Sequence, residues 1–266
     1  MSKVILITGA SSGIGKSIAT YLHHKGFKVY GTSRNPRTNS VQYGMVALDV
    51  TRPESIKNAV AEVIAMEGKI DVLINNAGKG ITGAIEDTPT DEMRANFNTN
   101  FFGVIDVVKA VLPHMREQGS GIIINTTSIA GYMGLPFRGI YSASKGALEL
   151  LTEALSMEVK SFGIHVVNVA PGDFATNIAA GRYHTPVFEN SAYKEKYAEN
   201  LALMDAHVDS GADPIIMAKA IYNIITSKRP NIHYKIGGFM EKFSIVLKRL
   251  LPDTWYEKLL MNHYKL

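Results

Sequence analysis

The chain has 266 residues, of which 46% are hydrophobic and 20% are charged, and these proportions exclude an intrinsically disordered protein. Its net charge of +4 is small and the basic residues are not obviously clustered, so the sequence does not indicate nucleic-acid binding. The absence of cysteine excludes disulfides and thiolate chemistry, and it fits a cytoplasmic location.

Targeting and membrane segments are not evident in the sequence. The apolar run at 4–7 is too short for the core of a signal peptide. No stretch reaches the roughly 18 apolar residues that a spanning helix needs. We therefore expect a soluble protein with at most a peripheral membrane contact. The eight histidines are scattered and match no metal-binding spacing, so no metal site is predicted.

Six short apolar runs in the first 170 residues predict buried β-strands, because they are apolar on both alternating faces. The predicted strands are 3–8, 28–32, 45–48, 72–75, 121–126 and 165–170. Helical periodicity between them predicts helices at 14–24, 56–66 and 144–159. This alternation predicts one α/β domain with a doubly wound parallel sheet of about seven strands and helices on both faces, which is the Rossmann fold.

The pattern changes after residue 173. Residues 177–213 are polar and aromatic-rich without a clear strand, and a long segment of this kind favours a substrate lid. A helix at 213–227 and a last strand at 232–236 follow. The tail, 239–264, predicts two amphipathic helices that meet at Pro252. These basic helices can pack within the protein, cover the pocket, join a neighbouring subunit or lie on a membrane. We favour packing within the protein, because the helices are short and packing needs no lipid.

A glycine-rich loop, "TGASSGIG" at residues 8–15, lies between the first predicted strand and the first helix. Glycine allows the backbone to turn sharply and to approach a ligand closely. The helix that follows offers free N–H groups and the positive end of its dipole to a phosphate. Because the loop lies between a strand and a helix, it indicates a nucleotide-binding site.

The spacing of this loop and four later motifs resemble the short-chain dehydrogenase/reductase family over nearly the whole chain. The later motifs are "NNAG" at 75–78, Asn100 in "NFF", Ser128 thirteen residues before "YSASK" at 141–145, and "PG" at 171–172 with Thr176 behind it. The resemblance implies hydride transfer between a nicotinamide cofactor and an alcohol or carbonyl.

Tyr141 and Lys145 are the candidate catalytic pair. Residues four apart lie on one face of a helix, so the lysine cation can lower the pKa of the phenol, which is ordinarily near 10. Tyr141 then serves as acid or base at the reacting oxygen. The resemblance further implies that Lys145 hydrogen-bonds the nicotinamide ribose, that Ser128 holds the substrate oxygen, and that Asn100 anchors a water of a proton relay.

NADP(H) is predicted in preference to NAD(H). The second strand is followed by Ser33-Arg34 instead of the acidic residue that usually binds the ribose hydroxyls of NAD, and Arg34 can pair with a phosphate. Arg37 lies close by in the sequence. By resemblance, Asp49 contacts the adenine ring. The full set of predicted cofactor-binding residues is Gly9, Ser11, Ser12, Gly13, Ile14, Gly15, Ser33, Arg34, Asp49, Val50, Asn76, Ala77, Gly78, Tyr141, Lys145, Pro171, Gly172, Phe174 and Thr176.

The resemblance also bears on the substrate and the assembly. "YKIGG" at 234–238 and "LKRLLP" at 247–252 resemble the hydroxysteroid-dehydrogenase-like branch, which implies a lipophilic alcohol or ketone. A homodimer or homotetramer is implied, built on the two long helices that cover the sheet. Two alternatives stay open. One is a non-catalytic NADP(H)-binding sensor, which would not need the four catalytic residues. The other is a sugar-nucleotide epimerase or dehydratase, which the glycine spacing disfavours.

Overall fold

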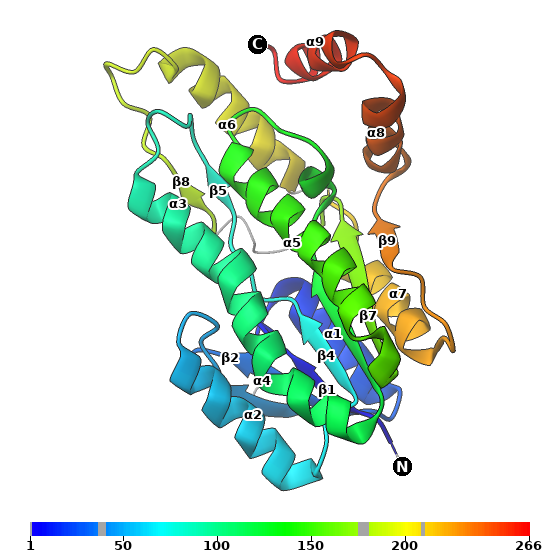
Figure 1. Cartoon of the computed structure of the whole chain (residues 1–266). Coiled ribbons are helices and arrows are strands. Elements are labelled where there is room, and N and C mark those ends of the chain that lie inside the picture. The colour runs from blue at the N-terminus through cyan, green and yellow to red at the C-terminus, as the bar shows by residue number, and fades with distance from the viewer. Residues whose placement is uncertain (1, 37–40, 175–180, 209–210) are drawn as a thin grey trace.

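The computed structural model of the protein describes residues 2–36, 41–174, 181–208 and 211–266 (Figure 1). Its strands are β1 (Val4–Ile7), β2 (Lys28–Ser33), β3 (Gly44–Ala47), β4 (Val72–Asn75), β5 (Ile81–Thr82), β6 (Gly121–Thr126), β7 (Ile164–Pro171), β8 (Tyr183–His184) and β9 (His233–Ile236). Its α-helices are α1 (Gly13–His24), α2 (Pro53–Glu67), α3 (Thr90–Phe97), α4 (Gly103–Gln118), α5 (Gly139–Glu158), α6 (Lys194–Val208), α7 (Pro214–Thr226), α8 (Phe239–Leu250) and α9 (Asp253–His263). Thr176 and Arg37 of the predicted site lie outside the described residues.

Seven strands form one parallel sheet in the order β3-β2-β1-β4-β6-β7-β9. The chain winds outward from β1 in one direction through β2 and β3, and in the other through β4 to β9. The predicted doubly wound Rossmann sheet is therefore confirmed. Ligands of such sheets bind at the carboxyl ends of the strands, where the winding direction reverses.

Each face of the sheet is covered by its own helices (Figure 1). Alternate residues of β1 divide between the two cores: Val4 and Leu6 pack with α2, α4 and α5, whereas Ile5 and Ile7 pack with α1 and α7. All four side chains are essentially inaccessible to solvent. This burial on both faces explains why the strands are continuous apolar runs.

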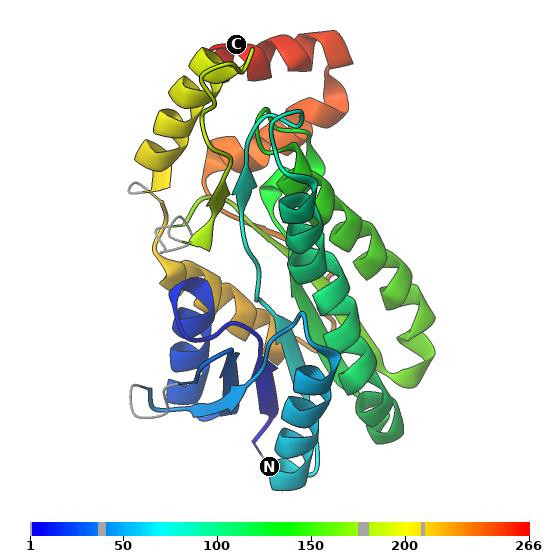
Figure 2. The same cartoon turned by 90° about the vertical axis from the view of Figure 1, so that its left-hand side faces the viewer.

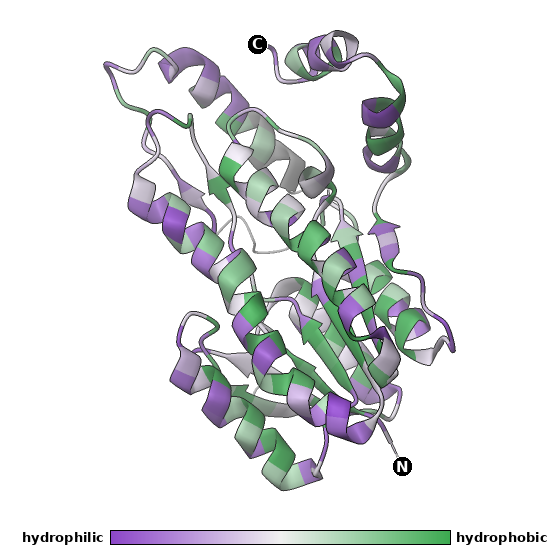
Figure 3. Cartoon of the chain, in the orientation of Figure 1, coloured by the Kyte–Doolittle hydropathy of each residue, from purple (hydrophilic) through white to green (hydrophobic). Residues whose placement is uncertain are grey.

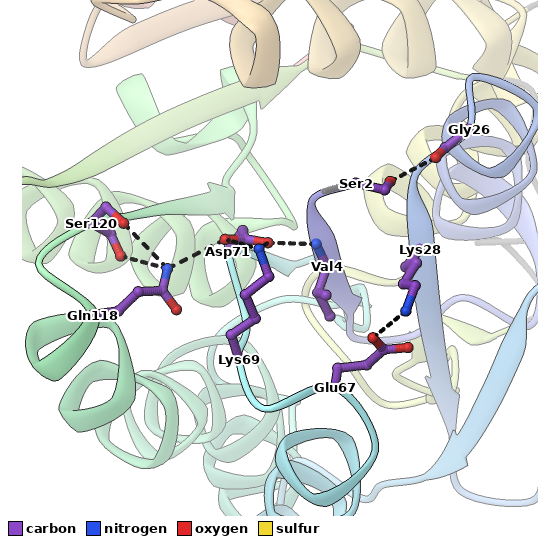
Figure 4. Close-up of polar contacts among 9 residues, drawn as sticks. All are labelled: Ser2, Val4, Gly26, Lys28, Glu67, Lys69, Asp71, Gln118 and Ser120. Atoms are coloured by element: carbon purple, nitrogen blue, oxygen red, sulfur yellow. Dashed lines mark hydrogen bonds and ion pairs between the residues drawn. The ribbon is translucent and has the colours of Figure 1, made fainter.

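Polar contacts join neighbouring segments at the amino ends of the sheet strands (Figure 4). The Asp71 carboxylate accepts hydrogen bonds from Val4 N at 2.7 Å and from Gln118 Nε2 at 3.3 Å, and it pairs with Lys69. Lys28 pairs with Glu67 beside it. These contacts join β1, β2, β4 and the end of α4 at the edge opposite the strand ends where ligands bind, so we assign them to stability.

Three helical segments differ from the expectation. Helix α5 begins at Gly139 instead of residue 144, so Tyr141 lies within it. Helices α3 and α4, joined by a π-helical turn at Asn98–Phe102, were not predicted. The segment 177–213 holds β8 and α6 within its described part, so the expectation of no clear strand is wrong. Strand β8 escapes a pattern search because it has two residues and pairs only with β5.

The tail forms the two predicted helices, and both pack against the chain itself. Ile245 of α8 and Tyr256 of α9 are buried with Ile129 and Met133, which follow β6. Asn200 of α6 donates a hydrogen bond to the main-chain oxygen of Tyr264. No helix in the described part of the chain combines the length and hydropathy needed to cross a bilayer.

Candidate active site

A cleft with a volume of about 560 Å³ opens at the carboxyl ends of the sheet strands, and this volume is within the usual range for small-molecule sites. The residues just after β1, β2, β3, β4, β6 and β7 line it. All predicted cofactor residues that the structure describes line the cleft, and so does Ser128. Asn100 does not line it, and Thr176 lies outside the described residues.

The glycine loop forms the cleft wall at the amino end of α1. Gly9 and Gly13 have φ angles of +67° and +54°, which other residues rarely adopt. Ser12 is the N-cap residue, and its side chain makes no hydrogen bond to the first turn of α1. That turn contains no acidic residue. The start of α1 therefore offers main-chain donors that fit a phosphate group.

Thr8 joins the glycine loop to the "NNAG" motif. Its hydroxyl oxygen accepts hydrogen bonds from the main-chain N–H groups of Asn76 and Ala77, both at 3.0 Å. The Asn76 amide donates in turn to the carbonyl oxygens of Thr8 and Gly9. The sequence analysis did not single out Thr8. Its role is visible only once β1 and β4 are neighbours in the sheet.

Tyr141 and Lys145 both face the cleft from α5. Lys145 is buried, and its Nζ donates to the carbonyl oxygen of Thr126 at 2.9 Å. Burial lowers the pKa of the Lys145 ammonium to about 8. The guanidinium of Arg138 lies 5.5 Å from the centre of the Tyr141 ring, so a second cation is close to the phenol.

Asn100 lies beneath the cleft, in the π-helical turn, a feature often found at functional sites. Its side-chain oxygen accepts from Lys79 N and its amide donates to Lys79 O, each at 2.9 Å. A Cβ atom added to Gly78 would be 3.2 Å from Asn100 Oδ1 and 3.5 Å from Lys145 Nζ. Gly78 thus lies against both side chains, and a larger residue there would displace one of them.

Ser128 immediately follows the strand-end residues of β6 and caps a short 3-10 helix. Its Oγ accepts a hydrogen bond from Ala130 N at 3.1 Å. Since a hydroxyl can accept and donate at once, its proton stays available to a substrate oxygen.

Ser33 ends β2 and Arg34 follows it, and both line the cleft. Within the described residues, the buried Ser33 hydroxyl has no hydrogen-bond partner. Asp49 lies across from them. Burial alone would raise the pKa of the Asp49 carboxyl, but hydrogen bonds from Thr51 and the charge of Arg34 lower it overall. The orphaned hydroxyl beside a guanidinium fits a phosphorylated ribose.

Three cationic residues of the cleft were missed by the sequence analysis: Lys79, Arg138 and Arg182. They lie at the end of the cleft near Tyr141 and the β5–β8 pair, which we call the substrate end. Lys79 directly follows the "NNAG" motif and Arg138 lies three residues before Tyr141, so their neighbouring motifs were a usable signal, whereas Arg182 has none.

The tail contacts residues at the same end of the cleft. Glu241 of α8 accepts a hydrogen bond at 2.7 Å from the main-chain N–H of Asp173, the residue after Gly172. Tyr264 lies near Asp173 and Arg138, and both charges act on its phenol. Burial raises the pKa of the Tyr264 phenol, and Arg138 opposes that effect. The tail therefore contacts two residues that line the cleft, Arg138 and Asp173.

Comparison with known proteins identifies the family to which this site belongs. Residues 3–186 match the family model described as short chain dehydrogenase. The chain belongs to the short-chain dehydrogenase family. It is an oxidoreductase of the class that interconverts alcohols and carbonyls, as the motifs implied.

Relatives of this short-chain dehydrogenase span its whole length. It is 42% identical over 263 residues to a 3-ketodihydrosphingosine reductase of Bacteroides thetaiotaomicron, with 98% of each chain covered. The structure of a short-chain dehydrogenase from Streptomyces avermitilis shares 36% identity, a TM-score of 0.81 and 97% of both chains. The structure of ElxO with NADP bound shares 26% identity and a TM-score of 0.73, and covers 89% of this chain and 96% of its own.

Proposed function

We propose that this short-chain dehydrogenase interconverts a ketone and a secondary alcohol on a lipophilic molecule, with NADP(H) as the hydride carrier. The observation that carries the proposal is one cleft lined by the glycine loop, by Ser33-Arg34, and by Tyr141 with Lys145. The first two parts fit a phosphorylated dinucleotide. The third provides a proton donor within the same cleft.

In this proposal the bound nicotinamide supplies or takes up the hydride. Tyr141 gives a proton to the carbonyl oxygen during reduction and removes it from the hydroxyl during oxidation. Ser128 donates a hydrogen bond to the same oxygen. The Lys145 ammonium favours the ionised phenol, which prepares Tyr141 to exchange its proton near neutral pH.

We propose a role for the Asn100 side chain that differs from the one implied by the resemblance. Its side chain already bonds to both main-chain groups of Lys79, so it fixes the loop after β4 beside Lys145. We infer that a relay water would bind the main chain of the π-helical turn instead of the Asn100 amide.

A lipophilic substrate is supported by the relative from Bacteroides thetaiotaomicron, whose name identifies a ketone on a long alkyl chain. NADP(H) is supported by Arg34, by the orphaned Ser33 hydroxyl, and by the NADP bound to ElxO. A non-catalytic NADP(H) sensor on the same fold is the second candidate, but such a protein has no need for Tyr141, Lys145 and Ser128 together.

Consumption of NADPH with a series of 3-ketones of increasing chain length tests the proposal. We expect kcat/KM to rise with chain length, since each buried methylene contributes about 0.8 kcal/mol. Binding of NADPH without turnover on any ketone or alcohol would favour the sensor.

Tyr141→Phe removes the phenolic hydroxyl and should leave the cleft otherwise intact. We expect turnover to fall by about 10²–10⁴-fold, the usual contribution of a general acid or base, while NADPH still binds. Tyr21→Phe, on α1 away from the cleft lining, is the control. Turnover within a few-fold of the native rate would show that Tyr141 is not the acid.

Arg34→Asp removes the cation that we assign to the ribose phosphate and places a like charge there. A hydrogen bond to a charged group is worth about 1.5–3 kcal/mol, so the ratio of kcat/KM for NADPH to that for NADH should fall by about 10- to 100-fold. Arg52→Asp is the matched control, because Arg52 also acts on Asp49 but does not line the cleft. An unchanged ratio would assign the phosphate to another group.

A further inference from the structure

Helix α8 has an apolar face that its own packing does not use. Its inner face is anchored by Ile245, which is buried. A second apolar stripe, Phe239, Phe243, Val246 and Leu250, runs along the helix at spacings of four, three and four residues, so it lies on one side. Phe239 and Phe243 stack with their ring centres 5.6 Å apart.

This stripe is exposed. The exposed fraction is 74% for Phe239 and 76% for Leu250, and Phe243 and Val246 are also exposed. Helix α9 adds Trp255 and Leu259, one turn apart and exposed as well. We call Phe239, Met240, Phe243, Val246, Leu250, Trp255 and Leu259 the tail patch. Single exposed apolar residues are ordinary, whereas a row of them on adjacent helices indicates an interaction surface.

The charges around the tail patch are mainly positive. Residues 239–266 contain five lysines and arginines and three acidic residues. Two of the three acids bond within the chain: Glu241 to Asp173 N, and Asp253 to Lys248. Lys242, Arg249 and Lys258 are exposed. Figure 3 shows hydrophilic and hydrophobic segments alternating along α8 and α9.

These charges favour one of two possible binding partners of the tail patch, a second copy of the chain or a lipid surface. A second copy of the chain, related by a two-fold axis, would present the same patch and bring lysines toward lysines. An anionic lipid surface has the opposite charge, and it takes up both aromatic rings and aliphatic chains at its interface. Charge complementarity therefore favours lipid.

The helices that carry the tail patch contact the cleft through other residues. They hold Glu241 and Tyr264 near Asp173 and Arg138, which line the substrate end. Figures 1 and 2 place α8 and α9 at the end of the molecule opposite the N-terminus. Docking there would leave the sheet and its amino-terminal edge facing the solvent.

We propose that the tail patch is a peripheral docking surface for anionic lipid bilayers. The apolar stripe of α8, with Trp255 and Leu259, enters the interfacial layer, and Lys242, Arg249 and Lys258 contact lipid phosphates. The inference is independent of the proposed reaction.

Vesicle sedimentation of the full chain tests the proposal without any substrate. The probes are vesicles of phosphatidylcholine alone and of phosphatidylcholine mixed with phosphatidylglycerol. We expect the protein to pellet with the anionic vesicles and to be released at high salt. No pelleting with anionic vesicles, or equal pelleting with both kinds, would overturn the proposal.

Three variants locate the contact. Leu250→Glu combined with Trp255→Glu should lower the partition coefficient at least about 10-fold, because it removes inserted apolar surface and adds repulsive charge. Lys242→Glu combined with Lys258→Glu should lower it similarly, since each basic residue contributes about 1 kcal/mol. Met66→Glu on α2 is the control, because Met66 is also exposed but lies on another helix. NADPH binding by each variant checks that the fold is retained.

Light scattering in lipid-free buffer tests whether the tail patch binds a second copy of the chain instead of a membrane. The proposal expects the Leu250→Glu/Trp255→Glu variant to keep the native mass. A smaller mass for that variant would show that the tail patch joins copies of the chain, and would overturn the proposal. A protein that binds anionic vesicles but turns over no ketone would contradict only the proposed function.

Discussion

Lys145 combines burial with a charge that the proposed chemistry needs. Its pKa of about 8 means that the ammonium predominates at neutral pH and is lost as the pH rises further. We therefore predict that kcat/KM for NADPH, which reports the free enzyme, falls above about pH 8 in the reductive direction. A profile that stays flat to pH 10 would contradict this role.

The same pKa predicts how stability changes with pH. The ordinary lysine pKa is 10.5, so between pH 8 and 10.5 the unfolded chain binds a proton at Lys145 that the folded chain does not. The free energy of unfolding should therefore contain a term that rises with pH in this window. Lys145→Met should remove that term, as measured by urea unfolding at several pH values. Lys219→Met, on α7, is the control and should keep it.

At the scale of elements, the position of α5 over the sheet depends on a row of buried polar groups. Asn75 of β4 donates to Asn125 of β6, and Asn125 donates to Thr152 of α5, both at 2.9 Å. These bonds fix α5 two turns after Lys145. They therefore help to position Tyr141 and Lys145, the proposed catalytic pair.

Thr152→Val keeps the shape of the side chain but leaves the Asn125 amide without its acceptor. We expect a loss of about 1–3 kcal/mol in the free energy of unfolding, the cost of an unsatisfied buried donor. Thr226→Val on α7 is the matched control, because its hydroxyl makes the same bond to a carbonyl four residues back but is exposed. Equal losses for both variants would show that the Asn125 contact adds nothing.

Sequence reasoning predicted the inner strands well, because β1, β4 and β6 are buried on both faces and are rich in apolar residues. It predicted the cleft from motifs whose residues lie at strand ends. It missed β5 and β8, since two residues carry no periodicity. It also missed Arg182, because the pairing of β8 with the distant β5 brings it to the cleft. Lys79 and Arg138 were missed although they lie beside the motifs at 75–78 and 141–145.

At the scale of the whole molecule, the assembly remains a prediction. On the inner side of α5, Leu148 is buried in the chain's own core, and Leu151 and Leu155 pack against that core. Leu150 and Met157, seven residues apart on α5, have exposed fractions of 69% and 73% and provide the outward apolar face.

We therefore predict that the protein is a homodimer or homotetramer through the outer face of α5. Leu150→Glu combined with Met157→Glu should lower the mass measured by light scattering, because two charges would be buried in the contact. Met66→Glu is again the control. A monomeric native protein, or a variant of unchanged mass, would exclude this face.

The strand order has a consequence for how the chain folds as it is made. Strand β1 emerges first and occupies the middle of the sheet, and each later strand of the sheet adds to an outer edge that already exists: β2 and β3 on one side, then β4, β6, β7 and β9 on the other. No strand has to insert between two that are already paired. The sheet can therefore grow outward in the order of synthesis on the ribosome, without reopening any ladder of hydrogen bonds.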